Sequence, residues 1–208
     1  MTGHFDKNLN LRQIILDQRP KLILECGAGE GACTRLLAHM QLWYEFQLYV
    51  VSDKELPDLA WNPDVHWRTG ISYLEIPKLE DASVGLAIID TDHNYWTLTQ
   101  ELEALIPKME EGGLVVMHDV ESFYHNTGMS MSYWNGTPYP EAEIKSHVKD
   151  GGLGDALIDF LHRNRGFFKL RNYVTEHHGC AVIEKRSVTE TCLITPGTQP
   201  PYAKPVIP

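Results

Sequence analysis

The chain has 208 residues and a formal net charge of −10 at pH 7, and 43% of its residues are hydrophobic while 22% are charged. These values are typical of one soluble globular domain with a sizeable core. The acidic balance, with no Lys/Arg cluster that could neutralise phosphates, argues against nucleic acid and anionic membrane surfaces as partners. No apolar run reaches the roughly 18 residues of a membrane span, and the start of the chain lacks a signal segment, so we expect a cytoplasmic protein.

The first half of the chain alternates predicted helices and strands. Apolar residues spaced for one face of a helix occur in the segments 8–18 and 33–45, and we expect Trp43 on the buried face of the second. Apolar runs typical of buried strands occupy residues 22–25, 46–53, 65–70 and 83–90. This alternation predicts a parallel sheet with helices on both faces.

The second half begins with one more predicted helix and strand, and the alternation then stops. A helix is predicted over residues 95–109, with Gly112 and Gly113 ending that segment before a fifth strand over 114–119. Residues 121–165 combine a lid-like insertion, rich in aromatic, Gly, Asn and Pro residues, with one or two helices. Residues 167–185 are typical of two strands in a closing hairpin. We therefore predict one domain over residues 1–186, followed by a Pro-rich tail over 187–208 that is extended or disordered.

Four cysteines are too few and too irregularly spaced to build a disulfide framework. Cys26, Cys33, Cys180 and Cys192 form no CxxC pair, and two of them lie in or beside a glycine-rich stretch. We interpret them as reduced structural residues.

A glycine-rich turn, "LILECGAGEGA", places Gly27, Gly29 and Gly31 between the first predicted strand and the following helix. Glycine allows a tight turn and a close approach to a ligand, and the helix start offers unpaired N–H groups. Because ligands of open α/β sheets bind at the carboxyl ends of strands, this turn predicts a cofactor site.

Two cofactor classes fit this turn. Gly27, Gly29 and Ala32 satisfy the loose dinucleotide pattern, and Asp53 at the end of the second strand could bind a ribose. Glu25, two positions before the first glycine, would repel a pyrophosphate but would suit the ammonium group of a sulfonium cofactor. An NAD-dependent oxidoreductase therefore remains the alternative to a sulfonium-dependent enzyme.

The pattern Glu25-x-Gly27-x-Gly29-x-Gly31 resembles motif I of the class I S-adenosylmethionine-dependent methyltransferases. The stretches "IIDTDHNYW" and "GGLVVMHDV" are similar to the branch that includes small-molecule O-methyltransferases and cephalosporin-hydroxylase-like proteins. The resemblance extends from about Leu11 to Lys185. It implies an α/β fold with a Rossmann-like, doubly wound, seven-stranded, mostly parallel sheet and a C-terminal antiparallel hairpin.

The resemblance also implies which residues bind S-adenosylmethionine. The glycine turn and Glu25 would hold its methionine end, Asp53 its ribose, and the residues after the third strand its adenine. The implied set is Glu25, Gly27, Ala28, Gly29, Gly31, Asp53, Gly70, Ile71, Ser72 and Asp90.

Ionisable residues follow the fourth and fifth strands, which burial alone does not explain. Methyl transfer to oxygen needs a hydroxyl that loses its proton, and His93 has a suitable ordinary pKa for the base. The two strands lie side by side in the family, so Asp90 and the pair His118–Asp119 would meet there. These three residues form a predicted site for Mg²⁺ or Mn²⁺, or they are polar catalytic groups that orient the substrate without a metal. His118 departs from the acidic or amide ligand more common in metal-dependent members, and the metal therefore stays an open question.

Substrate contacts are predicted for Asp92, Tyr95, Trp96 and His118, next to the same strand ends. Asp92 could instead cap the following helix, and the two aromatic residues could simply pack. The aromatic residues of the insertion would line an apolar substrate pocket or anchor the loop, namely Phe123, Tyr124, Tyr133 and Trp134. His125 and His147 are further candidates for the base.

These features predict an S-adenosylmethionine-dependent methyltransferase that acts on a hydroxyl of a small molecule, with divalent metal assistance left open. Besides the oxidoreductase, the alternative is a non-catalytic S-adenosylmethionine-binding module whose strand-end charges are structural. A nucleic-acid methyltransferase fits least well, because the chain has neither an "NPPY"-type motif nor a basic surplus. The sequence leaves open whether a homodimer covers the insertion.

Overall fold

The computed structural model describes residues 9–59, 62–121, 133–134, 137–138 and 151–187. The insertion residues Phe123, Tyr124, His125 and His147 lie outside the described residues, as does the tail after residue 187. The proposed roles of these segments are therefore still predictions.

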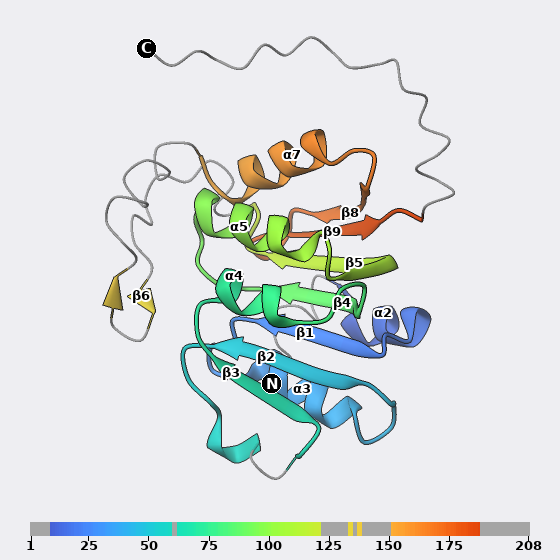
Figure 1. The fold of residues 1–208 in the computed structure, drawn as a ribbon, viewed down its shortest axis with the longest axis vertical. Helices are drawn as coiled ribbons and strands as arrows, with labels where there is room; N and C mark the ends of the chain where they lie inside the picture. Colours follow the sequence, from blue (N-terminus) through green and yellow to red (C-terminus); the bar gives the residue numbers. More distant parts are fainter. Residues whose placement is uncertain (1–8, 60–61, 122–132, 135–136, 139–150, 188–208) are drawn as a thin grey trace.

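A seven-stranded sheet, with strand order β3-β2-β1-β4-β5-β9-β8, forms the centre of the molecule (Figure 1). Its strands are β1 Leu22–Cys26, β2 Gln47–Ser52, β3 Val65–Thr69, β4 Val84–Ile89, β5 Met109–His118, β8 Phe168–Val174 and β9 Cys180–Lys185. The strands from β3 to β5 pair in parallel, whereas β9 runs antiparallel to both of its neighbours. The predicted fold class is confirmed. Two further short strands, β6 Tyr133–Trp134 and β7 Thr137–Pro138, pair with each other.

Helices cover both faces of the sheet (Figure 1). They are α2 Leu11–Gln18, α3 Ala32–Met40, α4 Ser72–Glu75, α5 Tyr95–Leu105 and α7 Leu153–Arg163, with 3-10 turns η1 Pro57–Leu59 and η2 Ile76–Lys78. Helices α5 and α7 pack on one face, and α2 and α3 pack on the other. Helix α2 begins after Asn10, whose side chain accepts a hydrogen bond from the backbone N–H of Gln13.

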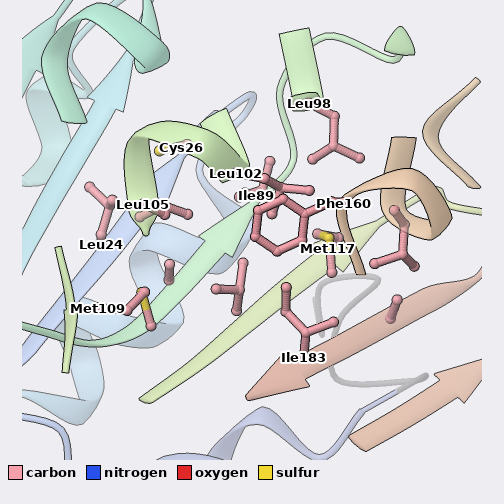
Figure 2. Close-up of a cluster of buried hydrophobic side chains, with 14 of the residues drawn as sticks. Leu24, Cys26, Ile89, Leu98, Leu102, Leu105, Met109, Met117, Phe160 and Ile183 are labelled. Carbon is pink, nitrogen blue, oxygen red and sulfur yellow. The ribbon is translucent and has the colours of Figure 1, made fainter. Parts of the chain in front are cut away.

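The core has two layers because the central strands are buried on both faces. Leu24 and Cys26 of β1 belong to the layer under α5 and α7, whereas Ile23 belongs to the layer under α2 and α3. Figure 2 shows Leu102 of α5 and Phe160 of α7 in the first of these layers. Strands that are buried on both sides have continuous apolar sequences, which is why their positions were predictable.

Helix α3 is shorter than its sequence pattern predicts. It ends at Met40, and the backbone N–H groups of Trp43 and Tyr44 both donate to the Met40 carbonyl in a turn. The turn leads the chain back toward β2 and leaves Trp43 78% exposed. The prediction that Trp43 lies on a buried helical face is therefore wrong.

The connection between α5 and β5 also differs from the prediction. Helix α5 ends at Leu105, and Gly112 and Gly113 lie inside β5 instead of separating a helix from a strand. The pairing of β5 with β4 shifts register in this region, and Gly112 has a positive φ of 77°. An irregularity of this kind inserts extra residues into one strand, and glycine adopts the required backbone conformation without strain.

Two sequence expectations concern the chain as a whole. Among the residues that the structure describes, no helix is long and apolar enough to cross a membrane. None of the three described cysteines forms a disulfide, and their interpretation as reduced structural residues stays a prediction.

Candidate active site

The glycine turn between β1 and α3 contains glycines with different roles. Gly27, Gly29 and Gly31 have φ values of 90°, 51° and 82°, which favour glycine over other residues. A Cβ atom on Gly27 would lie 2.0 Å from the carbonyl oxygen of Asp90, so this glycine lets the ends of β1 and β4 approach each other. A Cβ atom on Gly29 would meet nothing within 4 Å. Gly29 therefore borders open space that a ligand could occupy.

Glu25 is a buried carboxyl group at the end of β1, only 1% exposed. The Thr34 hydroxyl donates to its Oε1 at 3.0 Å, whereas its Oε2 is buried and makes no hydrogen bond within the described part of the chain. Burial raises the pKa of Glu25 to about 8, and interactions with Thr34 and Cys33 oppose this effect. Because a buried acceptor without a donor is costly, a cationic donor from a ligand would suit this position.

The other predicted cofactor residues lie beside the glycine turn. The Ser52 hydroxyl donates to Oδ1 of Asp53 at 3.1 Å and accepts from the backbone N–H of Ala28 at 3.4 Å. The backbone N–H of Gly70 donates to the Ser52 carbonyl at 3.1 Å. Segment 70–72, which follows β3, is thus held next to the end of β2. The structure brings all three predicted cofactor segments to the carboxyl edge of the sheet.

The ionisable residues after β4 and β5 form one cluster. His93 Nε2 lies 2.8 Å from Asp119 Oδ2 and 3.7 Å from Asp90 Oδ1. His118 Nδ1 lies 3.1 Å from Asp119 Oδ1 and 3.8 Å from Asp90 Oδ1. Because β4 and β5 are parallel neighbours, their carboxyl ends carry these residues to the same place, as the sequence predicts.

Asp119 has an unusual backbone conformation within this cluster. Its φ of 60° is left-handed, a region in which Asp is tolerated better than most residues. The two oxygens of its carboxylate contact different histidines, His93 and His118. Such conformations concentrate at functional sites, where the surrounding structure holds them in place.

Within the cluster, the pKa values of the two histidines and of Asp119 are shifted in opposite directions. Burial alone would lower the pKa of His93, but interactions with Asp119 and Asp90 outweigh it and raise that pKa to about 9. The pKa of His118 is raised for the same reasons. Burial acts to raise the pKa of Asp119, but the two histidines hold it well below its usual range. The two aspartates thus make His93 a stronger proton acceptor than a free imidazole.

One group of side chains in the described part of the chain has metal-ligand geometry. Asp90, His93 and Asp119 each offer a ligand atom, and these atoms lie within 4.8 Å of one another. The sequence predicted His118 as the third ligand, but its side chain is only 4% exposed and lies outside this group. His93 is thus a candidate both for the base and for a metal ligand, and the participation of His118 stays a prediction.

Tyr95 and Trp96, two of the predicted substrate residues, make contacts that serve the fold. Asn94, and not Asp92, caps α5 by accepting from the backbone N–H of Thr97 at 2.8 Å. The Tyr95 hydroxyl donates to Asp159 of α7 at 2.7 Å, and the ring of Trp96 packs edge-on against another aromatic ring. Substrate contact for these residues is still a prediction.

Sequence reasoning missed Glu101, which is fully buried on α5. Its Oε1 accepts hydrogen bonds from the hydroxyls of Ser72 and Thr91. It lines a small cavity of about 10 Å³ together with Asp90 and His93. The available signal was a carboxylate between apolar residues on the buried face of a predicted helix.

Comparison with known proteins identifies a methyltransferase domain in the central part of the chain. Residues 24–120 match a family described as a methyltransferase domain. No curated protein sequence matches the chain. The family match covers the glycine turn, the third-strand segment and the whole ionisable cluster.

Solved methyltransferase structures resemble the fold. The MycE methyltransferase of the mycinamycin biosynthetic pathway, in complex with Mg, SAH and mycinamycin VI, has a TM-score of 0.60 and 16% identity, over 91% of this chain and 51% of its own. The SAH-bound methyltransferase PaMTH1 of Podospora anserina has a TM-score of 0.56 and 13% identity, over 84% and 76%. The 1,6-didemethyltoxoflavin-N1-methyltransferase of Burkholderia thailandensis, with bound 1,6-didemethyltoxoflavin and S-adenosylhomocysteine, has a TM-score of 0.53 and 13% identity, over 89% of this chain and 80% of its own.

At such low identity these structures show a shared fold and no more. The chain spans about half the length of MycE. The family match and the sheet order agree with each other and with motif I. The resemblance predicted from the sequence is thereby confirmed: this is a protein of the class I S-adenosylmethionine-dependent methyltransferase fold, and its residues 24–120 match the methyltransferase domain family.

Proposed function

We propose that the protein is an S-adenosylmethionine-dependent methyltransferase that acts on a hydroxyl group of a small molecule. The observation that carries this proposal is the position of Asp90. Its backbone N–H donates to the carbonyl of Cys26 at 2.9 Å, directly before the glycine turn, while its side chain belongs to the His93–Asp119 cluster. The cluster therefore adjoins the expected cofactor site, where an acceptor hydroxyl would have to lose its proton.

The residues of the glycine turn fit the cofactor. Gly29 borders open space, and the buried Oε2 of Glu25 would accept a hydrogen bond from the ammonium group of the methionine end. Asp53, exposed at the end of β2, is available to the ribose hydroxyls. When bound, S-adenosylmethionine supplies an electrophilic methyl group. The protein has to hold the acceptor oxygen in line with that group and remove the proton from it.

His93 is the residue that we propose as the base, with Asp119 orienting its ring. The 2.8 Å contact between Nε2 of His93 and Asp119 fixes the side chain at the end of β5. Asp90 and Asp119, together with His93 or His118, would hold a divalent cation such as Mg²⁺ or Mn²⁺. Such an ion would orient substrate oxygens and lower the pKa of a hydroxyl. The Mg in the MycE complex is consistent with a divalent cation at such a site, and its mycinamycin VI is consistent with a small-molecule substrate.

The first test is calorimetric titration of the purified protein with S-adenosylmethionine, with NAD in parallel. We expect binding of S-adenosylmethionine and no binding of NAD. Binding of NAD alone would instead favour an oxidoreductase. If S-adenosylmethionine binds, methyl transfer to a panel of hydroxylated small molecules should be measured with wild type, His93→Ala and the exposed α3 control His39→Ala. Loss of transfer only in His93→Ala supports the base, whereas no transfer to any substrate would favour a non-catalytic binding module.

The metal is tested by thermal unfolding with and without Mn²⁺ or Mg²⁺. We expect either ion to raise the melting temperature of wild type, because it binds the folded state preferentially. Asp90→Asn and Asp119→Asn should remove this effect, and Asp17→Asn on the exposed face of α2 should retain it. The same increase in all four proteins would contradict the proposed metal site.

A further inference from the structure

The buried carboxyl group of Glu101 joins two loops that are far apart in the sequence. Its Oε1 accepts a hydrogen bond from the Ser72 hydroxyl, at the start of α4, and from the Thr91 hydroxyl at 2.7 Å. Ser72 belongs to the predicted adenine-binding segment, and Thr91 directly follows Asp90 in the loop that carries His93. A single oxygen atom on α5 therefore links the cofactor side of the site to the catalytic side.

A second contact spans the same elements. The ring of Tyr73 in α4 packs edge-to-face against Trp96 in α5, with centroids 5.0 Å apart. The start of α4 is thus fixed to α5 by a contact between two half-buried rings and by a hydrogen bond in the interior. Movement of the cofactor segment relative to α5 would disturb both contacts.

Burying a carboxyl group costs more free energy than a purely structural link at this position would require. Glu101 is fully buried next to Leu102, and its Oε2 makes no hydrogen bond within the described residues. Burial raises the pKa of Glu101 to about 8, against the opposing hydrogen bonds of Ser72 and Thr91. An apolar residue would extend the buried face of α5 at lower cost. Residues that break such a local rule are expected mainly at functional sites.

We propose that Glu101 is a positioning residue that couples cofactor binding at segment 70–72 to the placement of the loop Asp90–His93. The inference rests on the proposed function, because it assumes that segment 70–72 contacts the cofactor. Glu101 itself touches neither cofactor nor substrate, and it acts through the hydroxyls of Ser72 and Thr91. If this coupling exists, a substitution in the loop Asp90–His93 changes the affinity for the cofactor, because the hydrogen bonds of Glu101 connect that loop to segment 70–72.

The test is a mutant cycle read by calorimetric titration with S-adenosylhomocysteine. Thr91→Val should weaken binding about threefold or more, although Thr91 lies outside the predicted cofactor set. Ser72→Ala should also weaken binding, and the double variant should bind no more weakly than the weaker single variant, because both hydroxyls act through one carboxyl group. Thr99→Val, a buried threonine on α5 without this contact, is the matched control and should bind like wild type.

Variants of Glu101 separate positioning from simple stability. Glu101→Gln keeps an acceptor oxygen and should retain most of the affinity for S-adenosylhomocysteine. Glu101→Leu should bind it more weakly, and adding Thr91→Val to Glu101→Leu should not weaken binding further. Wild-type affinity in Thr91→Val and Ser72→Ala, both measured as folded proteins, would overturn the role of Glu101 and leave the proposed function intact. Failure of wild type to bind S-adenosylhomocysteine would instead overturn both proposals.

Discussion

Gly29 and Gly27 are glycines for different physical reasons, although both lie in one turn. At Gly27 a side chain would collide with the backbone of Asp90, so the residue is needed for packing between β1 and β4. At Gly29 the backbone is left-handed, with a φ of 51°, but no neighbouring atom restricts a side chain. Only Gly29 therefore allows a substitution that fills the expected ligand space without disrupting the core.

We predict that Gly29→Val weakens binding of S-adenosylhomocysteine about tenfold or more, because the branched side chain would occupy the space of the ligand. It should also lower the free energy of unfolding by about 1–2 kcal/mol, the cost of a left-handed conformation for a residue with a Cβ. Gly112→Val is the control, because Gly112 has a φ of 77°, equally open surroundings and a position inside β5. Calorimetry and urea unfolding of both variants separate the two effects, and equal affinities would refute the assignment of the turn.

At the scale of elements, a side chain from β9 determines how α5 passes into β5. The ammonium group of Lys185 donates to the carbonyl oxygens of Ile106 at 3.0 Å and Met109 at 2.7 Å. Burial lowers the pKa of Lys185, and nearby Glu111 and Asp81 oppose the shift. The Ile106 carbonyl directly follows the last residue of α5, and the Met109 carbonyl belongs to the first residue of β5. Lys185 therefore donates to both ends of the turn that joins the two elements.

Lys185→Met should therefore destabilise the protein by about 1–3 kcal/mol, the cost of leaving buried carbonyl groups without a donor. Cofactor affinity should stay unchanged, since the connection lies at the opposite end of the sheet from the glycine turn. Lys169→Met in β8, which breaks an ion pair with Glu184 at 3.0 Å, should cost less than about 1 kcal/mol. Urea unfolding of the two variants tests this, and an equal loss in both would mean that the carbonyl contacts of Lys185 contribute little.

At the scale of the whole molecule, two acidic groups from different elements are buried in the described interior. Burial raises the pKa of Glu25 on β1 and of Glu101 on α5 from the ordinary 4.5 to about 8. The folded state thus holds these protons more tightly than the unfolded state does. Below about pH 4.5 both states are protonated and the contribution to stability is complete. As the pH rises toward 8 the unfolded chain ionises first, and the contribution is lost.

We predict that the free energy of unfolding falls between about pH 5 and pH 8 in wild type. His93, with a pKa raised to about 9, acts in the same direction, so the contribution of each carboxyl group must be isolated by substitution. Glu25→Gln and Glu101→Gln should each reduce the fall, whereas Glu103→Gln, an exposed residue of α5, should reproduce wild type. Urea unfolding at several pH values is the measurement, and parallel curves for all four proteins would contradict the burial argument.

The sequence by itself determined the features that depend on neighbouring residues and on burial. Buried strands are apolar on both faces, a ligand-binding turn needs glycine, and parallel strands end at one edge of the sheet. These rules predicted the order of elements and the turn around Gly29. The meeting of Asp90 with Asp119 was predicted from the family resemblance, which implies that the fourth and fifth strands are neighbours. The roles of individual side chains in cofactor, metal and substrate binding are still predictions that the experiments above address.

Only the tertiary structure decided features whose partners come from distant parts of the chain. Lys185 of β9 donates to the carbonyls of Ile106 and Met109, in the turn between α5 and β5. Trp43 is exposed because α3 ends at Met40, before the turn that leads into β2. His93 joins the two aspartates through the geometry of the loop after β4, and Glu101 gains its role only when Ser72 and Thr91 fold against it. The spacing of apolar residues along the sequence predicts which residues are buried. The hydrogen-bond partner of a buried polar group depends instead on how distant elements pack together.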